Sequence, residues 1–104
     1  MQFLTYWELN EEMPIEQRQQ IAEHLTSSGA FPPPNVDILR WDATPDGWGI
    51  LLLEAESAAD CFRAINTWRA SGTGFFKITK TAPAMPVQEA MATATEMMEA
   101  LGAV

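Results

Sequence analysis

The feature that most constrains the fold is residues 49–54, which read Gly-Ile-Leu-Leu-Leu-Glu. A strand with one face in water alternates apolar and polar residues, whereas the stretch from Ile50 to Leu53 does not alternate. A short apolar run between a turn signal and a helix start is typical of a strand. We therefore predict a strand with both faces covered.

Composition limits the domain count and the kinds of partner. A chain of 104 residues, 47% of them hydrophobic, is long enough for one domain with a packed core. Its formal net charge of −8 repels phosphate backbones and anionic lipid surfaces. We expect neither nucleic acid nor a membrane as a partner.

Cysteine usage indicates the compartment. Cys61 is the single cysteine, so the sequence has no intramolecular disulfide and no zinc spacing of the C-x-x-C type. The chain also has neither a basic, apolar leader nor the roughly 20 consecutive apolar residues that span a membrane. We expect a cytoplasmic protein with no metal and no cofactor.

The first half of the chain predicts a strand, a helix and a connector. Residues 3–9 are rich in aromatic and β-branched types and predict a first strand, also covered on both faces. Pro14 suits the first helical position, and residues 27–29, Ser-Ser-Gly, end that helix. The proline-rich residues 31–35 predict a stiff connector within the domain.

A hairpin follows. Residues 36–43 predict a second strand, and residues 44–47, Thr-Pro-Asp-Gly, place proline and glycine where a tight turn needs them. The turn joins this strand to the strand that begins at Gly49.

A second helix and a last strand complete this part of the chain. Residues 57–60, Ser-Ala-Ala-Asp, resemble a capping box, and an apolar stripe follows at helical spacing. The stripe consists of Ala58, Cys61, Phe62, Ile65 and Trp68. Residues 72–74, Gly-Thr-Gly, are predicted to end the helix. Residues 75–81 predict a strand whose Lys77 and Lys80 suit a sheet edge.

The order βαββαβ predicts an α+β, ferredoxin-like antiparallel sheet, in which helices cover one face only. A closed homodimer is the commonest way to cover the other face with a second sheet. We assign residues 1–85 to this domain and residues 86–104 to an added C-terminal helix.

The predicted C-terminal helix is amphipathic. Its apolar stripe runs unbroken at helical spacing, with the glutamates elsewhere. The stripe consists of Val87, Ala90, Met91, Ala94, Met97, Met98 and Leu101. We predict that it packs on the body or on the dimer partner. The alternative is an adaptable, methionine-rich surface for other proteins.

Several short motifs together resemble a known family. They are Tyr6-Trp7, the three prolines 32–34, Arg40-Trp41, residues 46–55 (Asp-Gly-Trp-Gly-Ile-Leu-Leu-Leu-Glu-Ala) and Trp68. The pattern, over most of residues 1–87, resembles a small bacterial family of domains of unknown function, itself similar to the dimeric α/β-barrel superfamily. That superfamily includes cofactor-free monooxygenases, lactone isomerases, haem-dependent chlorite-degrading enzymes and stress-responsive proteins. The resemblance implies the fold and a dimer, and it implies no single activity.

No group of residues commits the chain to one chemistry. His24 is the only histidine, and Ser27 and Ser28 follow it on one helix face, which makes it a weak catalytic candidate. A histidine in a last helical turn more often faces the free carbonyls.

The acidic residues are further candidates. Glu8, Glu11, Glu12 and Glu16 lack the spacing and glycine of a calcium loop, so we interpret them as a solvated turn. Glu54 ends an apolar strand, where burial would suit a general base. More often, a carboxylate in this place caps backbone amides or pairs with Arg40 or a lysine.

The aromatic residues predict a cavity. Four tryptophans exceed what this length needs, and Tyr6, Trp41 and Leu52 are our candidates for lining an apolar binding site. A slip of one residue exchanges the faces of a strand, so either Arg40 or Trp41 faces that site.

These residues leave three functional hypotheses. The first is a homodimeric module that binds or senses an apolar small molecule. The second is a cofactor-free enzyme of the monooxygenase or isomerase type, with Glu54 taking a proton. The third is a protein-interaction subunit that uses the C-terminal helix.

Overall fold

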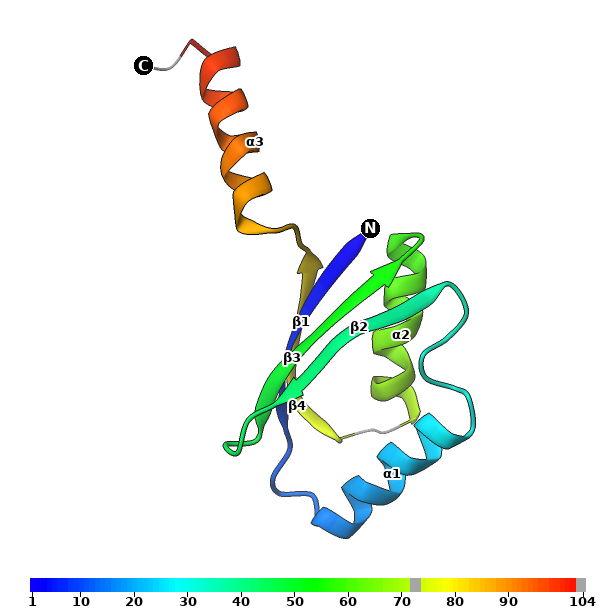
Figure 1. Cartoon of the computed structure of the whole chain (residues 1–104). Helices are drawn as coiled ribbons and strands as arrows, with labels where there is room; N and C mark the ends of the chain where they lie inside the picture. The colour runs from blue at the N-terminus through cyan, green and yellow to red at the C-terminus, as the bar shows by residue number, and fades with distance from the viewer. Residues whose placement is uncertain (72–73, 103–104) are drawn as a thin grey trace.

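The computed structural model describes residues 1–71 and 74–102 and contains a four-stranded sheet with three helices (Figure 1). The elements are β1 (Gln2–Leu9), α1 (Ile15–Ser27), β2 (Val36–Ala43), β3 (Trp48–Ala55), α2 (Ala58–Ser71), β4 (Phe76–Pro83) and α3 (Val87–Ala100). The predicted α+β, ferredoxin-like order is confirmed, with α3 added after it.

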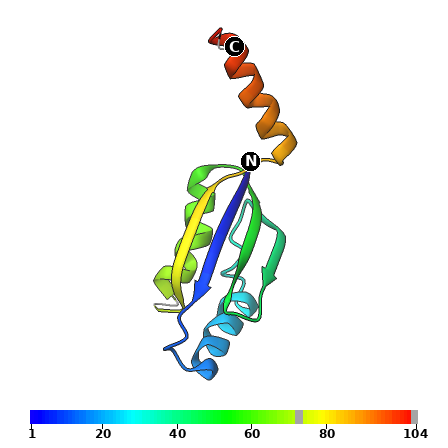
Figure 2. The same cartoon turned by 90° about the vertical axis from the view of Figure 1, so that its left-hand side faces the viewer.

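The sheet is antiparallel with strand order β2-β3-β1-β4, which Figure 2 shows from the side opposite the helices. β4 lies at one edge, as Lys77 and Lys80 predicted. α1 and α2 lie on one side of the sheet (Figure 1). We call this side the covered face and the opposite side the open face.

The predicted hairpin is confirmed. The Thr44 backbone N–H donates to the Trp48 carbonyl at 2.8 Å, and the Thr44 hydroxyl donates to the same oxygen at 2.9 Å. Gly47 has φ 78°, a backbone conformation that glycine adopts without a steric penalty. The turn therefore closes through the hydrogen bonds of Thr44 and the positive φ of Gly47.

The strand β3 buries only one of its two faces within this chain. Leu51 and Leu53 are buried on the covered face, at 4% and 0% exposure. Ile50 and Leu52, which alternate with them, are partly exposed on the open face. The predicted cover is thus present on one side, and cover of the open face stays a prediction about the assembly. The same holds for β1, where Phe3 is buried and Leu4 is 40% exposed.

The core lies between the helices and the covered face. It consists of Phe3, Trp7, Leu25, Phe31, Val36, Leu51, Leu53, Ala55, Cys61, Ala64, Trp68 and Phe75. Phe31 comes from the proline-rich segment, where we expected only a connector, yet its side chain is 2% exposed. Its backbone N–H donates to the Leu25 carbonyl at 3.0 Å, which ties the connector to the end of α1.

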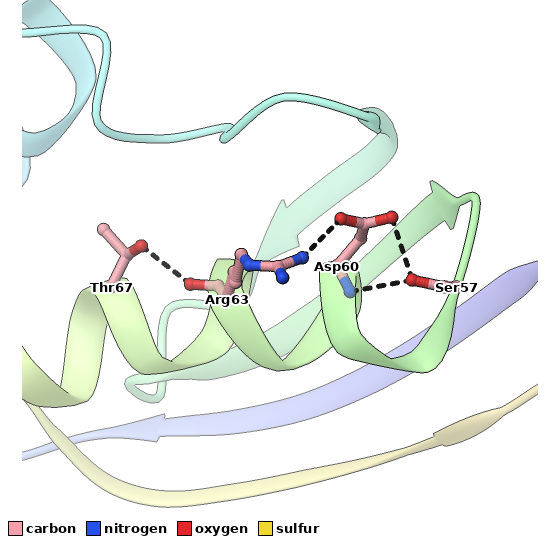
Figure 3. A network of polar contacts seen from close by, with 4 residues as sticks. All are labelled: Ser57, Asp60, Arg63 and Thr67. Carbon is pink, nitrogen blue, oxygen red and sulfur yellow. Dashed lines mark hydrogen bonds and ion pairs between the residues drawn. The ribbon is translucent and has the colours of Figure 1, made fainter.

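The predicted start of α2 is confirmed (Figure 3). The Asp60 backbone N–H donates to the Ser57 hydroxyl oxygen at 3.2 Å, and that hydroxyl donates to the Asp60 carboxylate at 2.9 Å. Arg63 Nη1 donates to the other carboxylate oxygen of Asp60 at 2.7 Å. Asp60 is therefore buried with its charge paired, which fixes the entry of the helix that covers the sheet.

Two details near α2 differ from expectation. Phe62, predicted in the buried stripe, is 69% exposed, because Cys61, Ala64 and Trp68 already fill the side that meets the sheet. Of the residues predicted to end α2, Gly72 and Thr73 lie outside the described part of the chain. β4 is shifted from the predicted residues 75–81, since Phe75 packs in the core just before the strand begins at Phe76.

The helix α3 projects beyond the end of the sheet, away from α1 and α2 (Figures 1 and 2). Residues 87–102 are all exposed. Residues 103 and 104 of the predicted C-terminal segment lie outside the described part. Within a single chain the apolar stripe of α3 does not meet the body, so packing on a partner stays a prediction.

Candidate functional site

The register of β2 decides which predicted site residues lie together. Pairing with β3 shifts between Ile38 and Arg40, which leaves Leu39 as an extra residue. After this bulge Arg40 is opposite Leu52 and Trp41 is opposite Leu51. Cross-strand partners share a face, so Arg40 lies on the open face and Trp41 on the covered face. The ambiguity left by the sequence is resolved in this way.

The predicted cavity of Tyr6, Trp41 and Leu52 does not form within this chain. Tyr6 is opposite Ile50 in the sheet, so Tyr6 and Leu52 belong to the open face. Trp41 lies on the other side, where its ring centroid is 5.6 Å from that of Trp68. Of the two residues that the sequence left as alternatives, Arg40 therefore shares the open face with Tyr6 and Leu52, and Trp41 does not.

The open face carries charges of both signs around its apolar residues. Arg40 pairs with Asp42 through an Nε–Oδ2 contact. Glu54 pairs with the Met1 amino group at 2.6 Å, and its side chain is 44% exposed. Glu54 is therefore not the buried carboxylate that a general base at this position requires.

Tyr6 lies on the open face, and its surroundings raise the pKa of its phenol. Loss of solvent around the phenol raises its pKa, and the Glu8 carboxylate raises it further by repelling the phenolate and accepting a hydrogen bond from the phenol. A phenol beside a carboxylate stays protonated and acts as a donor.

His24 is exposed on α1. Its carbonyl accepts the Ser28 N–H at 3.1 Å, while the Ser28 hydroxyl accepts the Ala30 N–H at 3.4 Å. The serine is thus engaged in ending the helix, and the two residues form no buried pair.

The covered face holds a cluster of aromatic rings centred on Trp68. Ring centroids of its neighbours lie 5.4 Å (Phe31), 5.6 Å (Trp41), 5.0 Å (Phe75) and 5.5 Å (Phe76) from that of Trp68. Trp7 joins through Phe76 at 5.8 Å. Pairs at these separations add to the stability that burial provides.

Gly49 makes room for this cluster. A Cβ atom at position 49 would lie 2.4 Å from Cζ2 of Trp7 and 2.0 Å from the Asp42 carbonyl oxygen. Only the absence of a side chain lets the Trp7 ring lie against β3.

Two polar groups inside the cluster have no partner. The indole N–H groups of Trp7 and Trp68 are buried, and neither meets an acceptor in the described part of the chain. Both rings line a cavity of about 10 Å³, together with Thr5 and Thr79. An unpaired buried donor typically costs about 1–3 kcal/mol, so a ligand or water oxygen here would be favourable.

A larger groove lies next to this cavity, between α2 and β4. It encloses about 410 Å³. Its walls are mainly apolar, from Phe3, Ala58, Cys61, Phe62, Ile65, Ala82 and Pro83, with Asn66, Arg69, Thr79 and Thr81 as the polar members. The groove and the inner cavity share Ile65 and Thr79 as lining residues.

Arg69 and Cys61 define the chemistry of the groove. Arg69 Nε donates to the Thr79 hydroxyl at 3.0 Å, at the boundary between groove and cavity. Burial raises the pKa of the Cys61 thiol, which therefore stays neutral near pH 7. The residues lining this groove include no carboxylate and no histidine. The site can bind an apolar molecule with oxygen acceptors but holds no conventional general base.

The described residues contain no group of three or more histidine, cysteine, aspartate or glutamate side chains placed to hold a metal ion. Among the same residues, no helix has both the length and the apolar character needed to cross a membrane.

Sequence reasoning found part of this site. It singled out Trp41 and the excess of tryptophan, but it missed that Trp7 and Trp68 line one cavity, and it missed the roles of Thr5, Thr79 and Arg69. For Thr5 and Trp7 the available signal was the alternation along β1, because residues 3, 5 and 7 of a strand share one face, and Phe3 is buried.

A family model described as a domain of unknown function (DUF3303) matches residues 1–98, so the chain belongs to that family. No curated protein matches the chain.

Three solved structures are similar at low identity. A microcompartment protein from Desulfitobacterium hafniense is 16% identical with a TM-score of 0.49, and the match covers 80% of this chain and 41% of that one. A 5-chloro-2-hydroxyhydroquinone dehydrochlorinase from Burkholderia phenoliruptrix, in complex with 2,5-dihydroxybenzoquinone, is 18% identical with a TM-score of 0.47 and coverages of 82% and 94%. A protein assigned as an antibiotic biosynthesis monooxygenase from Nitrosomonas europaea is 12% identical with a TM-score of 0.45 and coverages of 82% and 98%. Likeness at this level assigns no function to this chain.

Proposed function

We propose that this chain is a cytoplasmic small-molecule binding module that acts as a homodimer and binds its ligand between α2 and the sheet. The observation that supports a ligand here is that the buried indole N–H groups of Trp7 and Trp68 meet no acceptor among residues 1–71 and 74–102. A ligand oxygen in the cavity that both rings line would accept from donors that the described residues leave unpaired.

The sizes of the two spaces indicate how such a ligand would sit. The inner cavity of about 10 Å³ admits at most a single water. The groove of about 410 Å³ falls within the range of ordinary small-molecule pockets. The body of the ligand therefore occupies the groove, and its oxygen reaches the indoles past Ile65 and Thr79.

The lining indicates the class of ligand. The groove is mainly apolar, and its polar lining residues are Asn66, Arg69, Thr79 and Thr81, each of which has a side-chain hydrogen-bond donor. This combination favours a largely apolar molecule with one or more oxygen acceptors. An apolar small molecule was the partner that the sequence predicted, although we place it on the other face of the sheet.

The open face supports the homodimer. Leu4 and Trp48, at 40% and 39% exposure, lie there with the partly exposed Ile50 and Leu52. Charges of both signs surround these residues, from Arg40 and Lys80 to Glu8 and Asp42. A second copy of the same face offers apolar contact and opposite charges together.

The enzyme hypothesis has less support. It required Glu54 in a cavity with Tyr6, Trp41 and Leu52, whereas Glu54 is half exposed and faces away from Trp41. No lining residue of the groove replaces it as a proton acceptor. Binding without acid–base chemistry fits the groove better.

Native mass spectrometry of the protein purified from its own host tests both parts of this proposal, because it reports the assembly mass and any retained molecule. We expect a dimer with added mass that is lost in Trp68→Phe, which keeps an aromatic ring but removes the N–H donor. Trp48→Phe, on the open face, is the matched control and should retain the added mass. A protein without retained mass, and without thermal stabilisation by a panel of apolar oxygen-containing compounds, would contradict ligand binding. A monomer at micromolar concentration would contradict the dimer.

A further inference from the structure

The helix α3 exposes an apolar surface that its own chain does not use. Val87, Met91 and Leu101 are 72%, 65% and 79% exposed, and Met97 and Met98 are 59% and 55% exposed. A helix of this length in water is marginal unless one face packs on something. The stripe therefore requires a partner.

The connector keeps this helix away from its own sheet. The Ala84 N–H donates to the Gln2 carbonyl at 3.0 Å, so Ala84 is still held by the sheet. Only Met85 and Pro86 separate it from the first residue of α3, and Pro86 is extended, with φ −54° and ψ 144°. A connector this short and stiff directs the stripe toward another molecule.

The charges of α3 lie opposite its apolar stripe. Its charged residues are Glu89, Glu96 and Glu99. At 3.6 residues per turn, the seven stripe residues from Val87 to Leu101 fall on one side and the three glutamates on the other. Two such helices can bring their stripes together without opposing their carboxylates.

The stripe also has the spacing of a helix-pairing seam. Val87, Ala94 and Leu101 recur every seven residues, with Ala90 and Met97 three residues after the first two. This a and d pattern is the one by which helices pack side by side. The alanines at 90 and 94 allow the two backbones to approach closely.

The open sheet face of a partner suits α3 less well. The carboxylates on that face, from Asp37, Asp42, Glu8 and Glu54, outnumber the cations Arg40 and Lys80. The helix α3 has no cation to offer these carboxylates, whereas a second copy of the sheet brings Arg40 and Lys80 to them.

The size of the apolar stripe also indicates which molecule covers it. The apolar stripe of this 14-residue helix, about 21 Å long, has seven residues, whereas a stable interface buries about 800 Å² of accessible surface from about 20–30 residues on each partner. The stripe alone is too small to hold a separate protein. It is large enough to add to a contact that a second copy already makes elsewhere.

We propose that α3 packs through its apolar stripe against α3 of a second copy of this chain. The pairing adds to self-association through the open face and does not depend on a ligand in the groove.

Matched substitutions on the full chain test the pairing. Ala94 lies at the middle of the stripe, and Ala92 lies with the glutamates on the opposite side of the same helix; both are exposed. We expect Ala94→Glu to raise the dissociation constant for self-association about tenfold, since it places a charge in the seam. Ala92→Glu adds the same charge outside the seam and should leave the constant unchanged, as measured by sedimentation velocity over a concentration series.

Cysteine cross-linking distinguishes α3 from other partner surfaces. In a Cys61→Ala background, which removes the native thiol, Ala94→Cys should form a disulfide between copies under mild oxidation, and Ala92→Cys should not. Position 94 is midway between residues 87 and 101, so parallel and antiparallel pairing both bring it to its counterpart. Equal effects of the two glutamates, or a cross-link at 94 no faster than at 92, would overturn the pairing while leaving the ligand proposal intact.

Discussion

The two faces of the sheet are built by the same strands and differ sharply in what covers them. On β3, Leu53 is fully buried beneath the helices, while its neighbour Leu52 is partly exposed on the open face. On β1, Trp7 is 6% exposed and Leu4 is 40% exposed. An apolar run without alternation therefore does not mean that one chain buries both faces. In this chain the helices bury one face of the run, and burial of the other face would need a second molecule.

In our proposals the two faces have different roles, with ligand binding on the covered face and self-association on the open face. The covered face has unpaired donors beside a groove, which suits a ligand. The open face has apolar residues among mixed charges, which suits a copy of itself. Changes on one face should leave the activity of the other unaltered.

The largest expected effect is on stability. Leu53→Ala should lower the free energy of unfolding by about 2–5 kcal/mol at any protein concentration, because it opens a cavity in the core. Leu52→Ala should cost less at low concentration, with a loss that grows as the protein associates. Urea unfolding over a concentration series measures both. Equal, concentration-independent losses would remove the distinction between the faces.

The next effect is on ligand affinity. Trp41→Ala removes a wall of the inner cavity and should weaken binding about tenfold, or about 1.4 kcal/mol, in titration calorimetry with the retained molecule. Trp48→Ala and Glu54→Gln alter only the open face and should bind normally. A loss of binding in Glu54→Gln would instead place the ligand on the open face.

A smaller effect concerns pH and the covered face. Because burial raises the Cys61 pKa, the unfolded thiol ionises first as pH rises. Stability should therefore fall from the unfolded value near 8.5 upward and level off above the folded pKa. Comparing urea unfolding of the wild type and Cys61→Ala from neutral to alkaline pH measures this fall. An identical pH profile in the variant would contradict it.

The smallest effect concerns the phenol on the open face. Tyr6 is the only tyrosine, so the near-ultraviolet absorbance of tyrosinate reports it alone. Its titration midpoint should lie above the ordinary value of about 10, and Glu8→Gln should lower it, because the neighbouring carboxylate is lost. A midpoint unchanged by Glu8→Gln would show that the two side chains do not interact.

Local signals predicted the element order well. The turn of residues 44–47 and the cap of Ser57 and Asp60 depend on neighbours in sequence, and both are found in the structure. Core membership was harder to predict, because Phe31 is buried through contacts of its ring with Trp68 of α2 and Trp41 of β2. Phe62 is exposed because Cys61, Ala64 and Trp68 fill the side of α2 that meets the sheet.

The candidate site was predicted least well. The face on which Trp41 lies depends on the bulge in the pairing of β2 with β3, and no residue type in β2 predicts that bulge. The unpaired indoles of Trp7 and Trp68 come together from elements far apart in the sequence. Such contacts follow from packing as a whole and not from any local pattern.

Leu39, the extra residue in β2, is a position at which relatives of this chain can differ in length. Leu39 is 49% exposed and interrupts the alternation, so loss of this one position would leave Arg40 and Trp41 on their present faces in a regular strand. A gain of one residue between 38 and 40 would also restore a regular alternation, with Leu39 on the open face, the new residue on the covered face, and Arg40 and Trp41 on their present faces. Within the family, chains that are one residue shorter or one residue longer here should therefore keep the cation and the indole in the same order and on the same faces.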